Sequence, residues 1–183
     1  VEWVDIDFKG LIPGLISKRF DMAVSAIYIT DERKKVVDFT DSYYAGGLVV
    51  MVKADNKTIN KLADLDGKKV SVQVGTKSVS YLTEKFPKVQ RVEVEKNQEM
   101  FNLVDIGRAD AAVTGKPAAF QYVRTRPGLR VLDEQLTTEE YGMALRKDTP
   151  ELTKAVNGTI AKLKADGTYA GIVKKWFSNS AAK

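Results

Sequence analysis

Short apolar runs rich in β-branched residues alternate along this chain with amphipathic stretches, and this alternation constrains the fold more than any other feature. Five runs have the length and composition of β-strands, at residues 22–27, 48–53, 69–74, 111–114 and 141–145. Apolar residues recur at helical spacing in the segments around them, at residues 8–16, 100–104 and 152–163. Strands that alternate with helices at this spacing predict an α/β protein with largely parallel sheets.

The composition narrows the chemistry that such a fold can perform. The 183 residues include no cysteine and no histidine, which excludes disulfides, thiolate metal sites, cysteine nucleophiles and histidine-dependent triads. The longest apolar stretches contain only a few residues, which excludes a membrane-spanning helix. Lys and Arg outnumber Asp and Glu by 29 to 24, a mild excess that is weak evidence for nucleic-acid binding. Oxygen-ligand metals and carboxylate chemistry remain possible, but no nucleotide-phosphate or nucleic-acid motif is present, so we expect neither a cofactor nor a nucleic-acid partner.

Two segments far apart in the sequence resemble each other. Residues 18–26 read KRFDMAVSA and residues 107–115 read GRADAAVTG. Each fits a helix end, an Arg-x-Asp turn and a buried strand that ends on small residues. Two explanations stay open. Helix–strand joints converge on such patterns, and two similarly built α/β lobes would also produce them, each presenting the carboxyl end of a strand, where α/β sheets bind ligands.

The first candidate site follows the strand at 22–27. Thr30 fits a helix N-cap with Arg33 at the third helical position, where backbone N–H groups and a guanidinium can converge on a carboxylate. The same residues also fit an ordinary helix start followed by a solvated run of charges. The sequence pattern alone favours the ordinary helix start.

Two more candidates follow later strands. Gly75 permits a tight turn after residues 69–74, and Thr76 and Ser78 can cap the helix that comes next, whose N-terminus attracts anions. Residues 114–117, Thr-Gly-Lys-Pro, form a similar helix entry after the strand at 111–114. An ordinary turn and helix start between a strand and a helix explains both segments equally well. The acidic pairs 31–32 and 139–140 have no arrangement that suggests a catalytic dyad.

Taken together, these segments resemble the amino-acid-binding proteins of ATP-driven (ABC) importers, the periplasmic solute-binding family 3 with the type II fold. Four stretches across almost the whole chain carry the resemblance: residues 5–15, 29–44, 64–76 and 166–177. The stretch 29–44, ITDERKKVVDFTDSYY, is the most specific of them.

The resemblance implies two α/β lobes that close over a small ligand. The first lobe would comprise residues 1–45 and 142–183, and the second lobe residues 46–141. Two hinge strands would run near residues 46–50 and 140–143. The family's first strand and helix, about 40 residues with their loops, have no counterpart before Val1, so we expect an N-terminally truncated first lobe.

The resemblance also assigns ligand-binding roles. Arg33 matches the arginine that grips the ligand carboxylate, and Thr76 matches the carboxylate contact of the second lobe. Ser25 and Ala26 match a strand end that touches the ligand, and Gln73 matches a contact to the ligand side chain.

Two positions depart from the family pattern. Tyr28 replaces the usual Ser or Thr, so a bulky phenol would enter the pocket. Gly115 replaces the Asp that holds the ligand ammonium, a loss that costs about 2–5 kcal/mol of binding energy. Lys77 and Lys116 instead add positive charge nearby. We therefore expect binding of ordinary amino acids to be impaired by Tyr28, by Gly115 and by the truncation.

The resulting hypothesis is a non-enzymatic solute-binding protein that captures a small carboxylate-bearing ligand and presents it to a membrane permease. Its location would be periplasmic, or extracellular and lipid-anchored in a Gram-positive source. Two alternatives remain: a dehydratase-like enzyme on the same scaffold, and a fragment or domain-swapped homo-oligomer that completes the first lobe with another chain. The second alternative rests on the tendency of an exposed sheet edge to pair.

Overall fold

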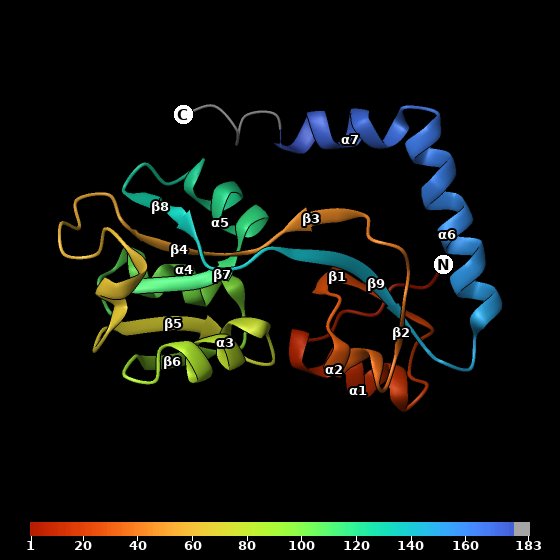
Figure 1. Cartoon of the computed structure of the whole chain (residues 1–183), viewed down its shortest axis with the longest axis horizontal. Helices are drawn as coiled ribbons and strands as arrows, with labels where there is room; N and C mark the ends of the chain where they lie inside the picture. The colour runs from red at the N-terminus through yellow and green to blue at the C-terminus, as the bar shows by residue number, and fades with distance from the viewer. Residues whose placement is uncertain (178–183) are drawn as a thin grey trace. The chain divides into compact units, whose positions relative to one another are not determined.

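The computed structural model describes residues 1–177, and their contacts divide the chain into two compact units (Figure 1). Unit 1 comprises Val1–Asp5, Gly10–Ala45 and the chain from Glu140 onward, and unit 2 comprises Ile6–Lys9 and Gly46–Glu139. Each unit combines a β-sheet with helices, which confirms the predicted α/β class. Within residues 1–177 no helix has the length and apolar character needed to cross a membrane.

Unit 2 is built on a five-stranded sheet in the order β6-β5-β7-β4-β8. Its strands are β4 (Leu48–Lys53), β5 (Lys69–Gln73), β6 (Gln90–Val94), β7 (Ala111–Gly115) and β8 (Leu129–Gln135). The interior strands β4 and β7 are buried along nearly their whole length. Burial on both faces explains why these two strands are continuous apolar runs.

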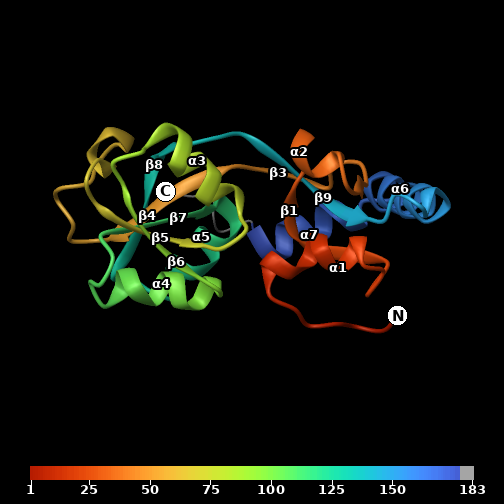
Figure 2. The same ribbon diagram turned by 90° about the horizontal axis from the view of Figure 1, so that it is seen from below.

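Helices cover both faces of this sheet. They are η2 (Leu62–Leu65), α3 (Lys77–Lys85), α4 (Asn97–Asp105) and α5 (Lys116–Val123). β5 pairs in parallel with both β6 and β7, so α3 connects β5 outward to β6 and α4 returns across β5 to β7. Because such crossovers are right-handed, the two helices must lie on opposite faces of the sheet, as Figure 2 shows.

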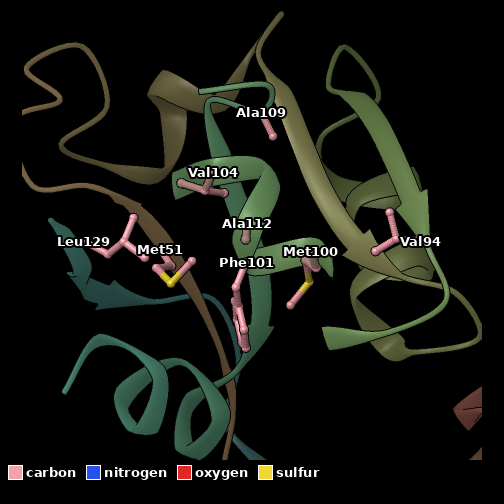
Figure 3. Packing of buried hydrophobic residues seen from close by; sticks show 8 residues of the cluster. All are labelled: Met51, Val94, Met100, Phe101, Val104, Ala109, Ala112 and Leu129. Carbon is pink, nitrogen blue, oxygen red and sulfur yellow. The ribbon is translucent and has the colours of Figure 1, made fainter. Parts of the chain in front are cut away.

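One hydrophobic core cluster of unit 2 joins α4 to the sheet. Figure 3 shows eight buried side chains of this cluster, which come from α4, from strands β4, β6, β7 and β8, and, for Ala109, from the turn before β7. Met100, Phe101 and Val104 of α4 are all at most 4% exposed. Phe101 also stacks on Tyr122 of α5, with ring centroids 4.3 Å apart. The apolar spacing predicted for residues 100–104 is therefore the packing face of a helix.

Unit 1 is built around β9 (Glu139–Leu145), whose first residue belongs to unit 2. β1 (Met22–Tyr28) and β2 (Asp38–Phe39) pair with β9 on either side, and β3 (Tyr44–Gly46) also pairs with it. Its helices are α1 (Leu11–Ile16), α2 (Asp31–Lys34), α6 (Pro150–Ala165) and α7 (Thr168–Phe177), while the short η1 (Phe8–Gly10) spans the change from unit 2 to unit 1 after Lys9.

The prediction of largely parallel sheets is wrong. The pairs of β5 with β6 and with β7 are parallel, whereas β4 is antiparallel to β7 and β8, and β9 is antiparallel to β1 and β2. A helical crossover fixes the relative direction only of the two strands that it joins, and says nothing of the other strands that pair with them. β4 and β9 instead pair with strands distant in the sequence, whose direction local periodicity cannot indicate.

Burial corrects two further expectations. The first of the two similar segments was expected to form a buried strand, but Met22 and Val24 of β1 are 37% and 47% exposed. Of the apolar face predicted for residues 152–163, only Ile160 is buried. The sequence also did not reveal β6 and β8, because these strands form the two edges of their sheet and carry polar residues at many positions.

Candidate functional site

In unit 1, the predicted helix start after β1 is confirmed. The hydroxyl of Thr30 accepts a hydrogen bond from the Arg33 backbone N–H at 3.2 Å, which caps the short helix α2. The Arg33 guanidinium donates from Nη1 to the carbonyl oxygen of Tyr28 at 2.9 Å. This bond ties the cationic group to the last residue of β1, so the orientation of Arg33 depends on how Tyr28 is held.

Tyr28 is held by a tyrosine cluster. Its ring stacks on Tyr141 of β9 with centroids 4.6 Å apart and an interplanar angle of 13°, and its hydroxyl accepts a 3.0 Å hydrogen bond from the Tyr141 hydroxyl. Tyr43 and Tyr44 extend the stack on Tyr141. Tyr28 is 6% exposed. Most of the phenol expected to reach a ligand is thus packed inside unit 1.

Sequence reasoning did not find the role of Tyr141. Burial raises the pKa of its phenol far above the ordinary value, and the neighbouring Tyr28 adds to this effect. This direction favours the protonated phenol, which donates the hydrogen bond to Tyr28. Burial also raises the pKa of Tyr43. The chain's several tyrosines were the only available signal, and their spacing in the sequence does not predict the stack.

Ser25 and Ala26 lie at an irregularity in the pairing of β1 with β9. The register shifts between Ala23 and Ile27, and Ala26 has a positive φ of 48°. Both Ser25 and Ala26 are exposed. A β-bulge re-aims the groups at a strand end, so this segment of β1 presents its backbone and small side chains to the outside of unit 1.

In unit 2, the remaining predicted residues gather at the C-terminal edge of the sheet, by which we mean the side on which the parallel strands β5 and β7 end. Gln73 ends β5, Thr76 precedes α3, and Gly115 ends β7. Because β5 and β7 are parallel neighbours, their carboxyl ends meet at the same edge. Gln73 donates from Nε2 to the backbone carbonyl of Glu95 at 2.9 Å, which links this edge to the end of β6.

The prediction that the Thr76 and Ser78 hydroxyls cap α3 is wrong. Thr76 occupies the N-cap position, but its hydroxyl donates to the carbonyl of Gln73 at 2.7 Å instead of accepting from the helix. Gly75, with φ of +75°, turns the chain back so that Thr76 faces the strand it has just left. Ser78 lies inside the helix and is buried. The first N–H groups of α3 are thus not capped by Thr76.

Two ion pairs flank this edge. Lys77, the first residue of α3, pairs with Glu139 at 2.6 Å, and Lys9 pairs with Glu95 at 2.6 Å. The segment Ile6–Lys9 lies so close to the turn after β5 that a Cβ placed on Gly75 would stand 3.0 Å from Cα of Lys9. Within residues 1–177, no three acidic side chains come together in a way that could hold a metal ion.

Comparison with known proteins gives a consistent picture. The sequence model of the bacterial extracellular solute-binding proteins, family 3, matches residues 1–179. The chain is similar to the ABC transporter arginine-binding protein 1 of Escherichia coli (strain K12), with 35% identity over 175 residues that cover 93% of this chain and 71% of that protein.

Two solved structures extend the likeness to the fold. A mutant of the arginine-binding protein of T. maritima superposes with a TM-score of 0.92 at 37% identity, covering 97% of this chain and 77% of that chain. The ancestral amino acid-binding protein AncCDT-1, a precursor of cyclohexadienyl dehydratase, superposes with a TM-score of 0.90 at 41% identity, covering 96% of this chain and 77% of that chain. The predicted fold class is confirmed.

Proposed function

This chain belongs to family 3 of the bacterial extracellular solute-binding proteins, and we propose that it captures a small carboxylate-bearing ligand, such as an amino acid, for the permease of an ABC importer. The observation that carries the proposal is the likeness, along nearly the whole chain, to proteins named for arginine or amino acid binding. We place the protein in the periplasm, or at the outer face of a Gram-positive membrane through a lipid anchor.

We assign residues 1–45 and 142–183 to a first lobe and residues 46–141 to a second lobe. The division of contacts, which changes between Ala45 and Gly46 and between Glu139 and Glu140, supports hinge strands near residues 46–50 and 140–143. At Gly47 the backbone has a positive φ of 153°, and a Cβ would overlap the carbonyl oxygen of Thr137. Only glycine fits there, as expected where two connecting strands lie close together.

Arg33 is the proposed clamp for the ligand carboxylate, because a guanidinium binds a carboxylate as a planar fork. The uncapped N–H groups after Thr76 form the second carboxylate contact. Ser25 and Ala26 contribute the exposed end of β1, and Gln73 faces the ligand side chain. Tyr28 acts mainly through its carbonyl, which orients Arg33.

Gly115 is the residue from which we expect a low affinity for amino acids. Without a carboxylate at this strand end, a ligand ammonium has no counter-charge there, so we expect binding of L-arginine, L-glutamine and L-histidine to be weaker than micromolar. Gly115 has φ of −65° and ψ of 137°, a conformation that aspartate adopts readily at a helix N-cap. Gly115→Asp is therefore expected to raise the affinity about tenfold or more.

Isothermal titration with these three amino acids tests the proposal, with Arg33→Lys as the clamp variant and Arg108→Lys, on the exposed turn before β7, as its matched control. We expect Arg33→Lys to abolish the measurable binding of Gly115→Asp and Arg108→Lys to leave it unchanged. Micromolar or tighter binding by the natural sequence would contradict the role of Gly115. Absence of binding by both the natural sequence and Gly115→Asp would contradict the proposed function.

Catalysis is the alternative, and the dehydratase-related structure at 41% identity is the observation that favours testing it. That protein is itself described as amino acid-binding, so we expect no turnover of prephenate or arogenate by this chain. Turnover above the uncatalysed rate would replace the binding proposal. The remaining alternative, a swapped oligomer without ligand binding, predicts a mass that rises with concentration in light scattering.

A further inference from the structure

The ion pair between Lys77 and Glu139 is more enclosed than the others of the described chain. The side chains of Lys77 and Glu139 are 29% and 12% exposed, and among the ion pairs within residues 1–177 no other has both partners below 30%. Removing either partner would leave a charge in a poorly solvated place. The pair is therefore a stronger local constraint than an ordinary surface salt bridge.

Lys77 occupies an electrostatically unfavourable position. It is the first residue of the nine-residue helix α3, where the helix dipole presents partial positive charge and repels a cation. It also directly follows Thr76, at the proposed carboxylate contact. The carboxylate of Glu139 offsets this repulsion in two ways: it neutralises the Lys77 ammonium, and it places a negative charge near the positive end of the helix dipole. Glu139 thus supplies to Lys77 the same chemical group that a ligand would bring.

Glu139 is also the last residue of unit 2. The next residue, Glu140, is bound within unit 1, where its carboxylate accepts a hydrogen bond from the Ser42 hydroxyl and its carbonyl accepts one from the Ile29 N–H at 2.9 Å. The chain therefore passes from one unit to the other between two adjacent glutamates that are each anchored in their own unit. If the ion pair with Lys77 broke, Glu139 would lose the contact that anchors its side chain in unit 2, directly before the chain enters unit 1.

We propose that Glu139 is a built-in substitute for the ligand carboxylate, which neutralises Lys77 in the ligand-free protein and is displaced from it when a ligand carboxylate reaches the N-terminus of α3. This inference rests on the proposed function. Because the ligand must compete with Glu139, the pair lowers the affinity for carboxylates. The same competition couples ligand capture to the strand β9, since the displaced residue begins that strand.

Charge-neutralising variants separate this role from a purely structural one. Glu139→Gln keeps the shape of the side chain but removes the competitor, so we expect it to bind L-arginine and L-glutamine about fivefold or more tightly than its parent, whereas Lys77→Met binds them more weakly. In the Lys77→Met background, Glu139→Gln is expected to change nothing. Glu84→Gln is the matched control, because Glu84 pairs with Lys85 at 2.7 Å at the opposite end of α3.

The exchanged pair Lys77→Glu with Glu139→Lys keeps an ion pair but reverses its polarity. We expect thermal stability near that of the parent together with loss of amino acid binding, an outcome that a structural role would not produce. All variants are compared in the Gly115→Asp background as well as in the natural sequence, so that binding is measurable. Unchanged or weaker binding by Glu139→Gln, or retained binding by the exchanged pair, would overturn the inference.

Chemical labelling distinguishes failure of the inference about Glu139 from failure of the proposed function. In ligand-free protein, acetic anhydride is expected to acetylate Lys77 faster in Glu139→Gln than in the parent, as measured by peptide mass spectrometry. Equal rates would show that Glu139 does not shield Lys77 and would overturn the inference even if amino acids bind. If no variant binds any of the amino acids, the proposed function fails and displacement by ligand fails with it, whatever the labelling shows.

Discussion

The two similar segments, residues 18–26 and 107–115, form the same local structure in different surroundings. In both segments, the residue after the helix has a left-handed backbone conformation: Lys18 has φ of 61° and Gly107 has φ of 74°. Each then leads through Arg-x-Asp into a strand. β7 lies between β5 and β4, however, whereas β1 pairs with β9 on one side only within the described chain. Val113 is consequently 0% exposed and its counterpart Val24 is 47% exposed.

The aspartates of the two segments differ in the same way. Asp110 accepts a 2.8 Å hydrogen bond from the Lys69 backbone N–H and so fastens the start of β7 to β5. Within residues 1–177 no second strand pairs with β1 next to Asp21, which instead pairs with Arg146 at 2.8 Å. A sequence pattern of this kind therefore specifies the turn and the strand, while the number of neighbouring strands decides burial and the use of the polar residues.

Matched truncations at Val113 and Val24 should show the largest difference between the segments. Val113→Ala removes two buried carbon atoms and leaves a cavity, so we expect it to lower the free energy of unfolding by about 2–3 kcal/mol. Val24→Ala removes atoms that are half exposed, and we expect a loss of about 0.5 kcal/mol or less. Urea denaturation followed by circular dichroism measures both.

An equally large loss for Val24→Ala would break the comparison. It would mean that β1 is covered in solution, and light scattering would then show whether a second copy provides the cover. A small loss at both positions would instead contradict the burial of β7.

The same distinction between local and distant causes explains what could be predicted. The cap of Thr30 on Arg33 follows from adjacent residues, and the sequence predicts it correctly. The strands with continuous apolar runs were also predicted, because burial on both faces marks their composition. The edge strands β6 and β8 were not, since only one side of each is paired and polar residues are tolerated there.

The candidate site divides in the same way. Local reasoning placed Gln73, Thr76 and Gly115 at strand ends, and parallel pairing of β5 with β7 brings those ends to one edge. The Thr76 hydroxyl was mispredicted because the turn at Gly75 redirects it to Gln73. The stack of Tyr28 on Tyr141 joins residues 113 positions apart, which no local pattern indicates.

The left-handed residues at the two helix ends offer a second, smaller contrast. A Cβ on Gly107 would meet nothing within 4 Å, so Gly107→Ala introduces only backbone strain, and we expect it to destabilise by about 1–2 kcal/mol. Lys18 already bears that strain. Lys18→Gly relieves it but makes the unfolded chain more flexible and loses an ion pair, so we expect a net gain of about 0.5 kcal/mol.

The two variants are expected to change the free energy of unfolding in opposite directions. The shift of the urea midpoint gives the sign of each change, provided that the m-value stays the same. Destabilisation by both substitutions would mean that the interactions of the Lys18 side chain outweigh the strain. Stabilisation by both would contradict the left-handed conformation at Gly107.

The side chain of Lys18 leads to the smallest expected effect, a pH dependence confined to the first segment. Lys18 pairs with Asp148 at 2.9 Å, and Arg146 pairs with the same carboxylate at 2.9 Å. The hydrogen bond from Lys18, followed by that from Arg146, lowers the pKa of Asp148 from its ordinary 3.8 to about 2. Because the folded-state pKa lies below the unfolded one, the stabilisation is complete above the ordinary pKa and is lost as the pH falls toward 2.

Asp148→Asn removes this contribution, so the difference in unfolding free energy between the parent and Asp148→Asn should be constant above pH 5 and should shrink between about pH 4 and 2. Lys18→Met should remove part of the same slope, because one of the two cations that hold the carboxylate is lost. A pH-independent difference for Asp148→Asn would show that solvent screens these exposed pairs completely. The left-handed Lys18 would then have no electrostatic compensation, and Lys18→Gly should gain correspondingly more.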